Sequence, residues 1–171
     1  MAVEPTGFIA LHLDGLRTLV ADCEAFQSWV GGEDAGEAKA SVYIEAFYTN
    51  DNLPVHRPFC LIGLVTSESE EVATRRLFTT SGGYRLIFEA NVDPEHAASQ
   101  EDAGFAFRNA VDAIIAEIKT KSDGEDEEGN SYVRISRLAL EDPMRRTDPL
   151  RGQVDGDAFS ESWTVMLGGW Q

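Results

Sequence analysis

An apolar stripe at helical spacing runs along residues 13–30 and ends directly before two glycines. The stripe repeats every three or four residues through Leu13, Leu16, Val20, Cys23 and Phe26, and Trp29 and Val30 continue it. This period places the side chains on one face of an α-helix, so the sequence predicts one amphipathic helix here. Glycine can adopt the left-handed backbone that closes a helix, and we therefore expect Gly31 and Gly32 to end it.

The position of the glycine pair bears on function, because adjacent glycines can also belong to a phosphate-binding loop. Such a loop follows a strand and precedes a helix, whose N-terminus supplies the N–H groups. Here the glycines follow the helix, and Glu33, Asp34 and Glu37 come just after them, where they would repel a phosphate. The glycine pair predicts a helix end rather than a nucleotide site.

Apolar runs in the rest of the chain predict five strands and a second main helix. The strands are expected at residues 41–47, 59–66, 84–92, 132–140 and 160–170, and the helix at residues 99–121. The first three strands follow one another and suggest an antiparallel meander. We expect an α+β fold, with a mixed or mainly antiparallel sheet of about five strands and both helices packed on one face. The residues expected in the core are Val20, Phe26, Leu61, Ile87, Phe107, Ile114 and Ile135.

Length and charge restrict the class of protein. A chain of 171 residues favours a single α+β domain spanning residues 1–171. Its net charge of −16 lacks the basic footprint of a nucleic-acid-binding protein, so we expect no sequence-specific binding to nucleic acid. The longest uncharged apolar run, residues 59–65, is far shorter than the ~20 residues of a membrane span. With no visible signal peptide, the sequence predicts a cytoplasmic product without membrane contact.

The residues that most often carry chemistry form no recognisable site in the sequence. Cys23 falls on the helix stripe and Cys60 in a strand, which predicts buried, reduced thiols. His12, His56 and His96 do not have the spacing of a zinc pair, and each is expected at the surface. The signatures of hydrolases, zinc proteases and nucleotide-binding proteins are missing from the sequence. The sequence therefore predicts no catalytic, cofactor-binding or metal-binding residue, and no enzyme.

Two charged segments of opposite sign remain as candidate sites. Half of residues 122–131 are acidic and none is apolar, which predicts a mobile loop. Residues 142–157 are expected to form a long loop carrying arginines, whose guanidinium groups pair well with carboxylates of a neighbouring subunit. Solvated charges on two flexible loops are the alternative interpretation. The candidate interface residues are Asp123, Glu125, Asp126, Glu127, Glu128, Arg145, Arg146 and Arg151.

The order of helix, three strands, helix and two strands carries a further resemblance. It is supported by the helix end at residues 26–31, by residues 38–44, by the Arg57-Pro58-Phe59 opening of a buried strand, and by WTVMLGGW at residues 163–170. Together these features resemble the tail terminator group of tailed bacteriophages and prophages, which includes head–tail joining and minor tail proteins.

The resemblance implies a structural role with no reaction and no cofactor. It implies self-association, in a ring that is typically hexameric, and contact with tail-tube and head-connector proteins. The protein would then be found in the cytoplasm of the bacterial host during assembly, and later in the virion tail or at the head–tail junction. The alternatives are a small cytoplasmic ligand-binding domain or enzyme of unknown reaction, with its site over the open face of the sheet, and a bacterial regulatory interaction protein.

Overall fold

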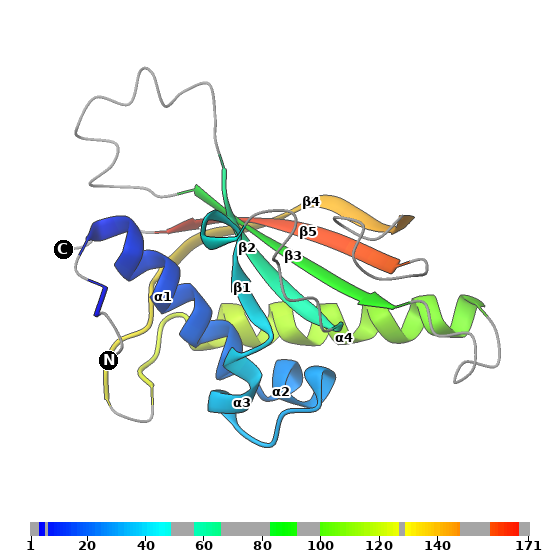
Figure 1. Ribbon diagram of the computed structural model, residues 1–171, viewed down its shortest axis with the longest axis horizontal. Helices are drawn as coiled ribbons and strands as arrows, with labels where there is room; N and C mark the ends of the chain where they lie inside the picture. The colour runs from blue at the N-terminus through cyan, green and yellow to red at the C-terminus, as the bar shows by residue number, and fades with distance from the viewer. Residues whose placement is uncertain are drawn as a thin grey trace.

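The strands form one five-stranded mixed sheet with the α-helices on one face of it (Figure 1). The computed structural model describes residues 4–5, 7–48, 57–65, 83–91, 100–126, 129–147 and 158–167. Its elements are α1 (Phe8–Ala21), α2 (Glu24–Val30), α3 (Ala35–Lys39), β1 (Val42–Ile44), the 3-10 helix η1 (Glu45–Phe47), β2 (Phe59–Leu64), β3 (Gly83–Asn91), α4 (Gln100–Lys121), β4 (Ile135–Thr147) and β5 (Ala158–Leu167). The predicted α+β fold is confirmed.

The sheet has the order β1-β2-β3-β5-β4, and the predicted meander is wrong at its first step. β1 runs parallel to β2, whereas the β2–β3, β3–β5 and β4–β5 pairs are antiparallel. An antiparallel return needs only a short turn, but residues 45–58 are long enough to carry the chain back to the starting end of β1. The predicted strand at 41–47 is accordingly short, because η1 replaces its second half.

The predicted helix at residues 13–30 is two helices. α1 ends at Ala21, and Cys23 has extended backbone angles (φ −71°, ψ 121°) before α2 begins. The predicted end of the stripe is confirmed, since Gly31 has a left-handed backbone with φ +74°.

Residues on α4 satisfy the backbone groups at this helix break. The Glu117 carboxylate accepts hydrogen bonds from the N–H groups of Glu24 (2.8 Å) and Ala25 (2.9 Å). The Lys121 ammonium donates to the carbonyl of Asp22 (2.5 Å). Desolvation alone would raise the pKa of Glu117, but the two backbone hydrogen bonds and Lys121 lower it. A negative group at one helix start and a positive group at another helix end are the arrangement that the helix dipole favours.

The short helix α3 was missed in the sequence, although a signal for it was present. The Asp34 side chain accepts from the Glu37 N–H (2.9 Å), while the Glu37 carboxylate accepts from the Glu33 N–H (3.0 Å). The first bond is one half of a capping box, whose sequence mark is an N-cap residue such as Asp34 followed three positions later by Glu. The second bond reaches one residue further, to the N–H that precedes the N-cap. The acidic residues after Gly31 thus begin a helix.

The main core lies between the sheet and the helices, as expected. Val20, Phe26, Phe107 and Ile114 are all at most 4% exposed within it. Leu61 is equally buried, but on the other face of the sheet in a small cluster with Tyr43 and Phe59, against which Ile87 is partly buried. Ile135 is only partly buried.

Both cysteines are fully buried free thiols, which confirms the prediction for Cys23 and Cys60. Burial raises the pKa of the Cys23 thiol to about 12 and raises the pKa of Cys60 as well. Both side chains therefore stay protonated and serve as small apolar groups of the core.

The long loop predicted at residues 142–157 is wrong over its first part, because β4 continues to Thr147. The pairing with β5 shifts between Asp142 and Arg145, a segment that contains Pro143. Proline lacks the N–H of a regular ladder and so suggests the end of a strand, but a bulge accommodates it and lets pairing resume. Residues 148–157 lie outside the described part of the chain.

Candidate functional site

The acidic segment after α4 forms a hydrogen-bonded turn over its described residues. The Asp126 N–H donates to the Asn130 carbonyl (2.8 Å), and the Tyr132 N–H donates to the Gly124 carbonyl (3.1 Å). Gly129 has φ +82°, a value that favours glycine. The mobility predicted for residues 122–131 concerns amide exchange and stays a prediction.

The turn is attached to α1 through the residues that follow it. The Tyr132 hydroxyl donates to the Asp22 carboxylate (2.5 Å) at the end of α1. Burial raises the pKa of Tyr132, and the hydrogen bond to the Asp22 carboxylate raises it further. Next to it Val133 packs on Gly15, where an added Cβ would lie 2.4 Å from Val133 Cγ1. The acidic turn therefore has a defined place against the first helix.

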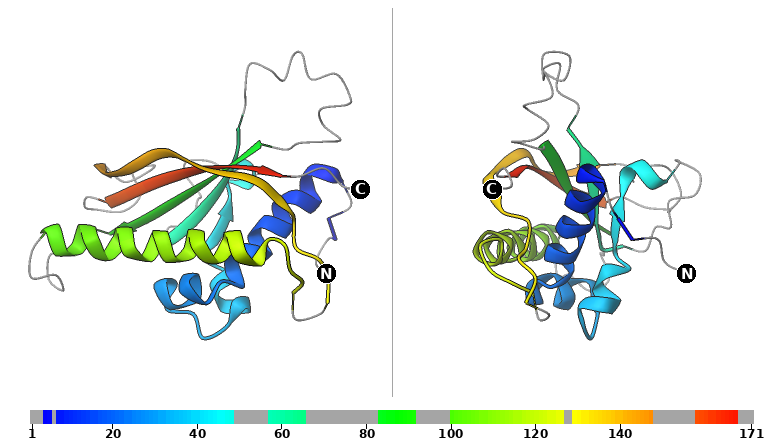
Figure 2. Two further views of the ribbon diagram at one scale, coloured as in Figure 1. Left: turned by 180° about the vertical axis from the view of Figure 1, so that it is seen from behind. Right: turned by 90° about the vertical axis from the view of Figure 1, so that its left-hand side faces the viewer.

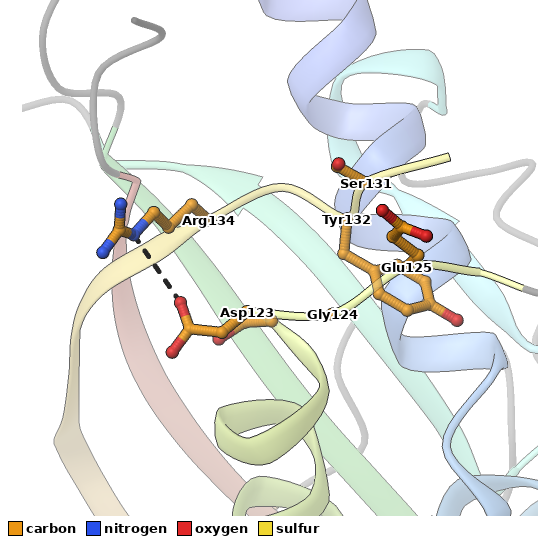
Figure 3. Close-up of a pocket in the computed structure, with 7 residues that line it drawn as sticks. Asp123, Gly124, Glu125, Ser131, Tyr132 and Arg134 are labelled. Carbon is orange, nitrogen blue, oxygen red and sulfur yellow. Dashed lines mark ion pairs between the residues drawn. The ribbon is translucent and has the colours of Figure 1, made fainter. Parts of the chain in front are cut away.

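Two open pockets flank Tyr132. The first, of about 410 Å³, is lined by Ser122, Asp123, Gly124, Glu125, Ser131, Tyr132 and Arg134 (Figure 3). Within it Arg134 and Asp123 form an ion pair at 3.6 Å, and both side chains are largely exposed. The second, of about 500 Å³, lies between Tyr132, Lys121, the end of α1 and the start of α3. The sequence pattern gave no sign of Asp22, Tyr132 and Arg134, because only the fold brings them beside the acidic turn.

The predicted interface residues differ in their exposure and in whether the structure describes them. Asp123 and Glu125 are exposed in the turn, Asp126 is partly buried within it, and Glu127 and Glu128 lie outside the described residues. Arg145 is exposed near the end of β4. Arg146 pairs with Phe159 through its backbone, while its side chain is outside the described part, as is all of Arg151.

Among the predicted interface residues, the acidic ones of the turn and Arg145 lie at opposite ends of the molecule. The acidic turn stands just before the start of β4, and Arg145 stands ten residues beyond Ile135 on the same strand. The residues of β5 opposite Ile135 and Arg145 are Leu167 and Ser160, seven positions apart, so at ~3.3 Å per residue this part of the separation is about 23 Å. Figure 2 shows the yellow segment after α4 at one end of the sheet and the orange end of β4 at the other. Asp123 and Arg145 therefore do not meet within one subunit. The neighbour of Arg145 is Asp142 at 3.6 Å, an exposed pair that contributes little to stability.

His12 is not at the surface, which corrects the sequence-based expectation. Only 2% of it is exposed, and its Nδ1 atom lies 3.0 Å from the Tyr84 hydroxyl. The helix begins at Phe8, so His12 is one turn before Leu16 and shares the apolar stripe. His56 and His96 lie outside the described residues.

We expect His12 to make folding stability depend on pH. Desolvation lowers the pKa of His12 from its usual value near 6.5. The unfolded chain therefore takes up a proton at a higher pH than the folded chain, and the free energy of unfolding should fall as pH drops from 7 towards 5. Urea titrations of the unchanged chain and of His12→Asn over this range should show a flatter dependence in the variant. Equal slopes would contradict this role. Glu117 and Glu141, whose pKa values are also lowered, would act mainly at more acidic pH and in both chains.

Among the residues that the structure describes, no group of three or more His, Cys, Asp or Glu side chains is arranged to hold a metal ion. None of the helices in the described ranges combines the length and apolarity needed to cross a lipid bilayer.

The chain matches no protein-family model, and no curated protein is significantly similar to it.

Proposed function

We propose that this protein is a structural tail-assembly component of a tailed phage or prophage, a ring-forming tail terminator or head–tail joining protein. The observation that carries the proposal is the separation of Asp123 and Glu125 from Arg145 at opposite ends of one subunit. In a closed ring each subunit contacts its two neighbours through two different patches. Opposite charges at two ends of one subunit suit that arrangement.

The details of the two ends support a role in subunit contact. The residues that follow the acidic turn are attached to α1 by Tyr132 and by the close approach of Val133 to Gly15, which places the turn beside that helix. Arg145 is 62% exposed at the side chain, and its 3.6 Å pair with Asp142 leaves it able to exchange partners. Complementary charge of this kind directs association and register.

The alternative of a ligand-binding domain or enzyme is favoured by the two pockets beside Tyr132. Their volumes fall in the range of small-molecule sites. However, they lie at the helix ends and are lined mainly by polar and charged residues, rather than over the open face of the sheet. A carboxylate-rich pocket next to an exposed acidic turn also fits a basic segment of a protein partner.

We expect replacement of Arg145, Arg146 and Arg151 by glutamate to abolish normal tails. Like charges would then face each other between neighbouring subunits. The measurement is electron microscopy of tails made in a host in which only the variant gene is supplied. A second chain that also carries Asp123→Arg, Glu125→Arg and Glu127→Arg restores opposite charge and should recover tail formation.

One result would exclude only the role of the arginines, and another would exclude the whole proposal. Tails of normal length that join heads normally in the arginine variant would remove these arginines from the interface. Normal tails after deletion of the whole gene would end the terminator proposal.

A further inference from the structure

β4 contains one residue more than β5 between two paired positions. Asp142 pairs with Ser162 and Arg145 pairs with Ser160, so three steps along β4 match two steps along β5. The extra residue makes a β-bulge, which interrupts the ladder and reorients the side chains beyond it.

The bulge decides which side chains face outward. In a regular strand Met144 would stand opposite Ser160 on the outer face, and Arg145 would point towards the helices, because successive side chains alternate. With the extra residue, Arg145 is exposed and Met144 is partly buried against the core. An added Cβ at Gly104 of α4 would lie 3.6 Å from the Met144 methyl group, so Met144 reaches the helix layer.

A buried carboxylate on β5 binds this bulge. Glu161 is 1% exposed, and its Oε2 accepts the backbone N–H of Met144 (3.1 Å). Its Oε1 accepts the indole N–H of Trp163 (2.7 Å), and Arg108 of α4 forms an ion pair with it. The Glu161 side chain thus supplies a buried acceptor to the Met144 N–H, next to Pro143, which has no N–H to offer.

We propose that Glu161 is a positioning residue that holds the β4 bulge and thereby keeps Arg145 on the outer surface. The importance of that position for assembly depends on the proposed function. The role of Glu161 at the bulge does not depend on the proposed function, since it follows from the contacts of Glu161 alone.

The test is the accessibility of single cysteines placed at the two positions. Cys23 and Cys60 are fully buried, so a maleimide reagent should label them slowly. In the otherwise unchanged chain, Arg145→Cys should react faster than Met144→Cys. When Glu161→Leu is added, Met144→Cys should react about tenfold faster or more, the factor expected for losing a hydrogen bond to a charged group. An unchanged rate at position 144 would overturn the proposal.

The matched control is Glu141→Leu, which removes an exposed carboxylate from β4 itself. It should leave the rate at position 144 within about twofold. A second measurement keeps the proposal testable if Glu161→Leu does not fold. In the unchanged chain the Met144 amide should exchange slowly with solvent, and exchange as fast as an open loop would contradict the proposed bond.

Tails formed by the Glu161→Leu chain separate the two proposals. If position 144 becomes reactive and tails fail, both agree with the result. If position 144 becomes reactive and tails are normal, Glu161 holds the bulge but Arg145 is not needed between subunits.

Discussion

Replacing Phe107 by alanine should lower the free energy of unfolding by about 3–5 kcal/mol. Phe107 is 4% exposed, and its ring lies 6.1 Å from that of Trp29 and 5.7 Å from that of Phe159, measured between centroids. Its side chain thus connects α2, α4 and β5, and truncation would remove apolar burial and leave a cavity at their junction. Urea denaturation followed by circular dichroism measures the change.

The control for this prediction is Phe105→Ala, two residues away on the same helix. Phe105 is 67% exposed, so its truncation should change the free energy of unfolding by about 0.5 kcal/mol or less. A loss below about 1 kcal/mol for Phe107→Ala would mean that this face of α4 does not cover the sheet.

Replacing Arg57 should also cost about 3–5 kcal/mol, because it takes the positive charge of the Arg57–Glu89 pair away from a buried carboxylate. The Arg57 and Glu89 side chains are 1% and 0% exposed, and the Arg57 Nε atom lies 2.6 Å from Glu89 Oε1. The two side chains form a buried ion pair. Arg57→Met is the variant of choice, since it keeps the apolar stem.

The comparison variants for this pair distinguish a buried charge from lost packing. The double variant Arg57→Met with Glu89→Leu should be more stable than Arg57→Met alone, because no buried charge remains. Glu141→Gln removes one member of the partly exposed Arg85–Glu141 pair and should cost about 1 kcal/mol or less. If Arg57→Met costs no more than Glu141→Gln, then the Arg57–Glu89 pair is not desolvated in solution.

The sequence predicted features that depend on neighbours along the chain. The apolar stripe located the first helical region, and Gly31 ended it, because both effects act within a few residues. The break after Ala21 could not be predicted in this way. It depends on Glu117, which is 93 residues from Glu24 along the chain and caps α2 only after α4 has packed.

The same limit applies to the candidate site. Composition identified the acidic segment and the arginines, but their separation follows from the continuation of β4 through Pro143. A proline there indicates a loop when only local preference is considered. The bond from Tyr132 to Asp22 spans 110 residues, and no local pattern indicates it.

The close approach of Gly15 to Val133 has a consequence for how this protein can change during evolution. Even an alanine at position 15 would collide with Val133 Cγ1, so the two positions should not vary independently. A relative with a larger residue at position 15 should have a smaller one at position 133, and a relative with glycine at 15 can keep a branched residue opposite. Coupled variation at these two positions would identify distant relatives whose sequences have otherwise diverged.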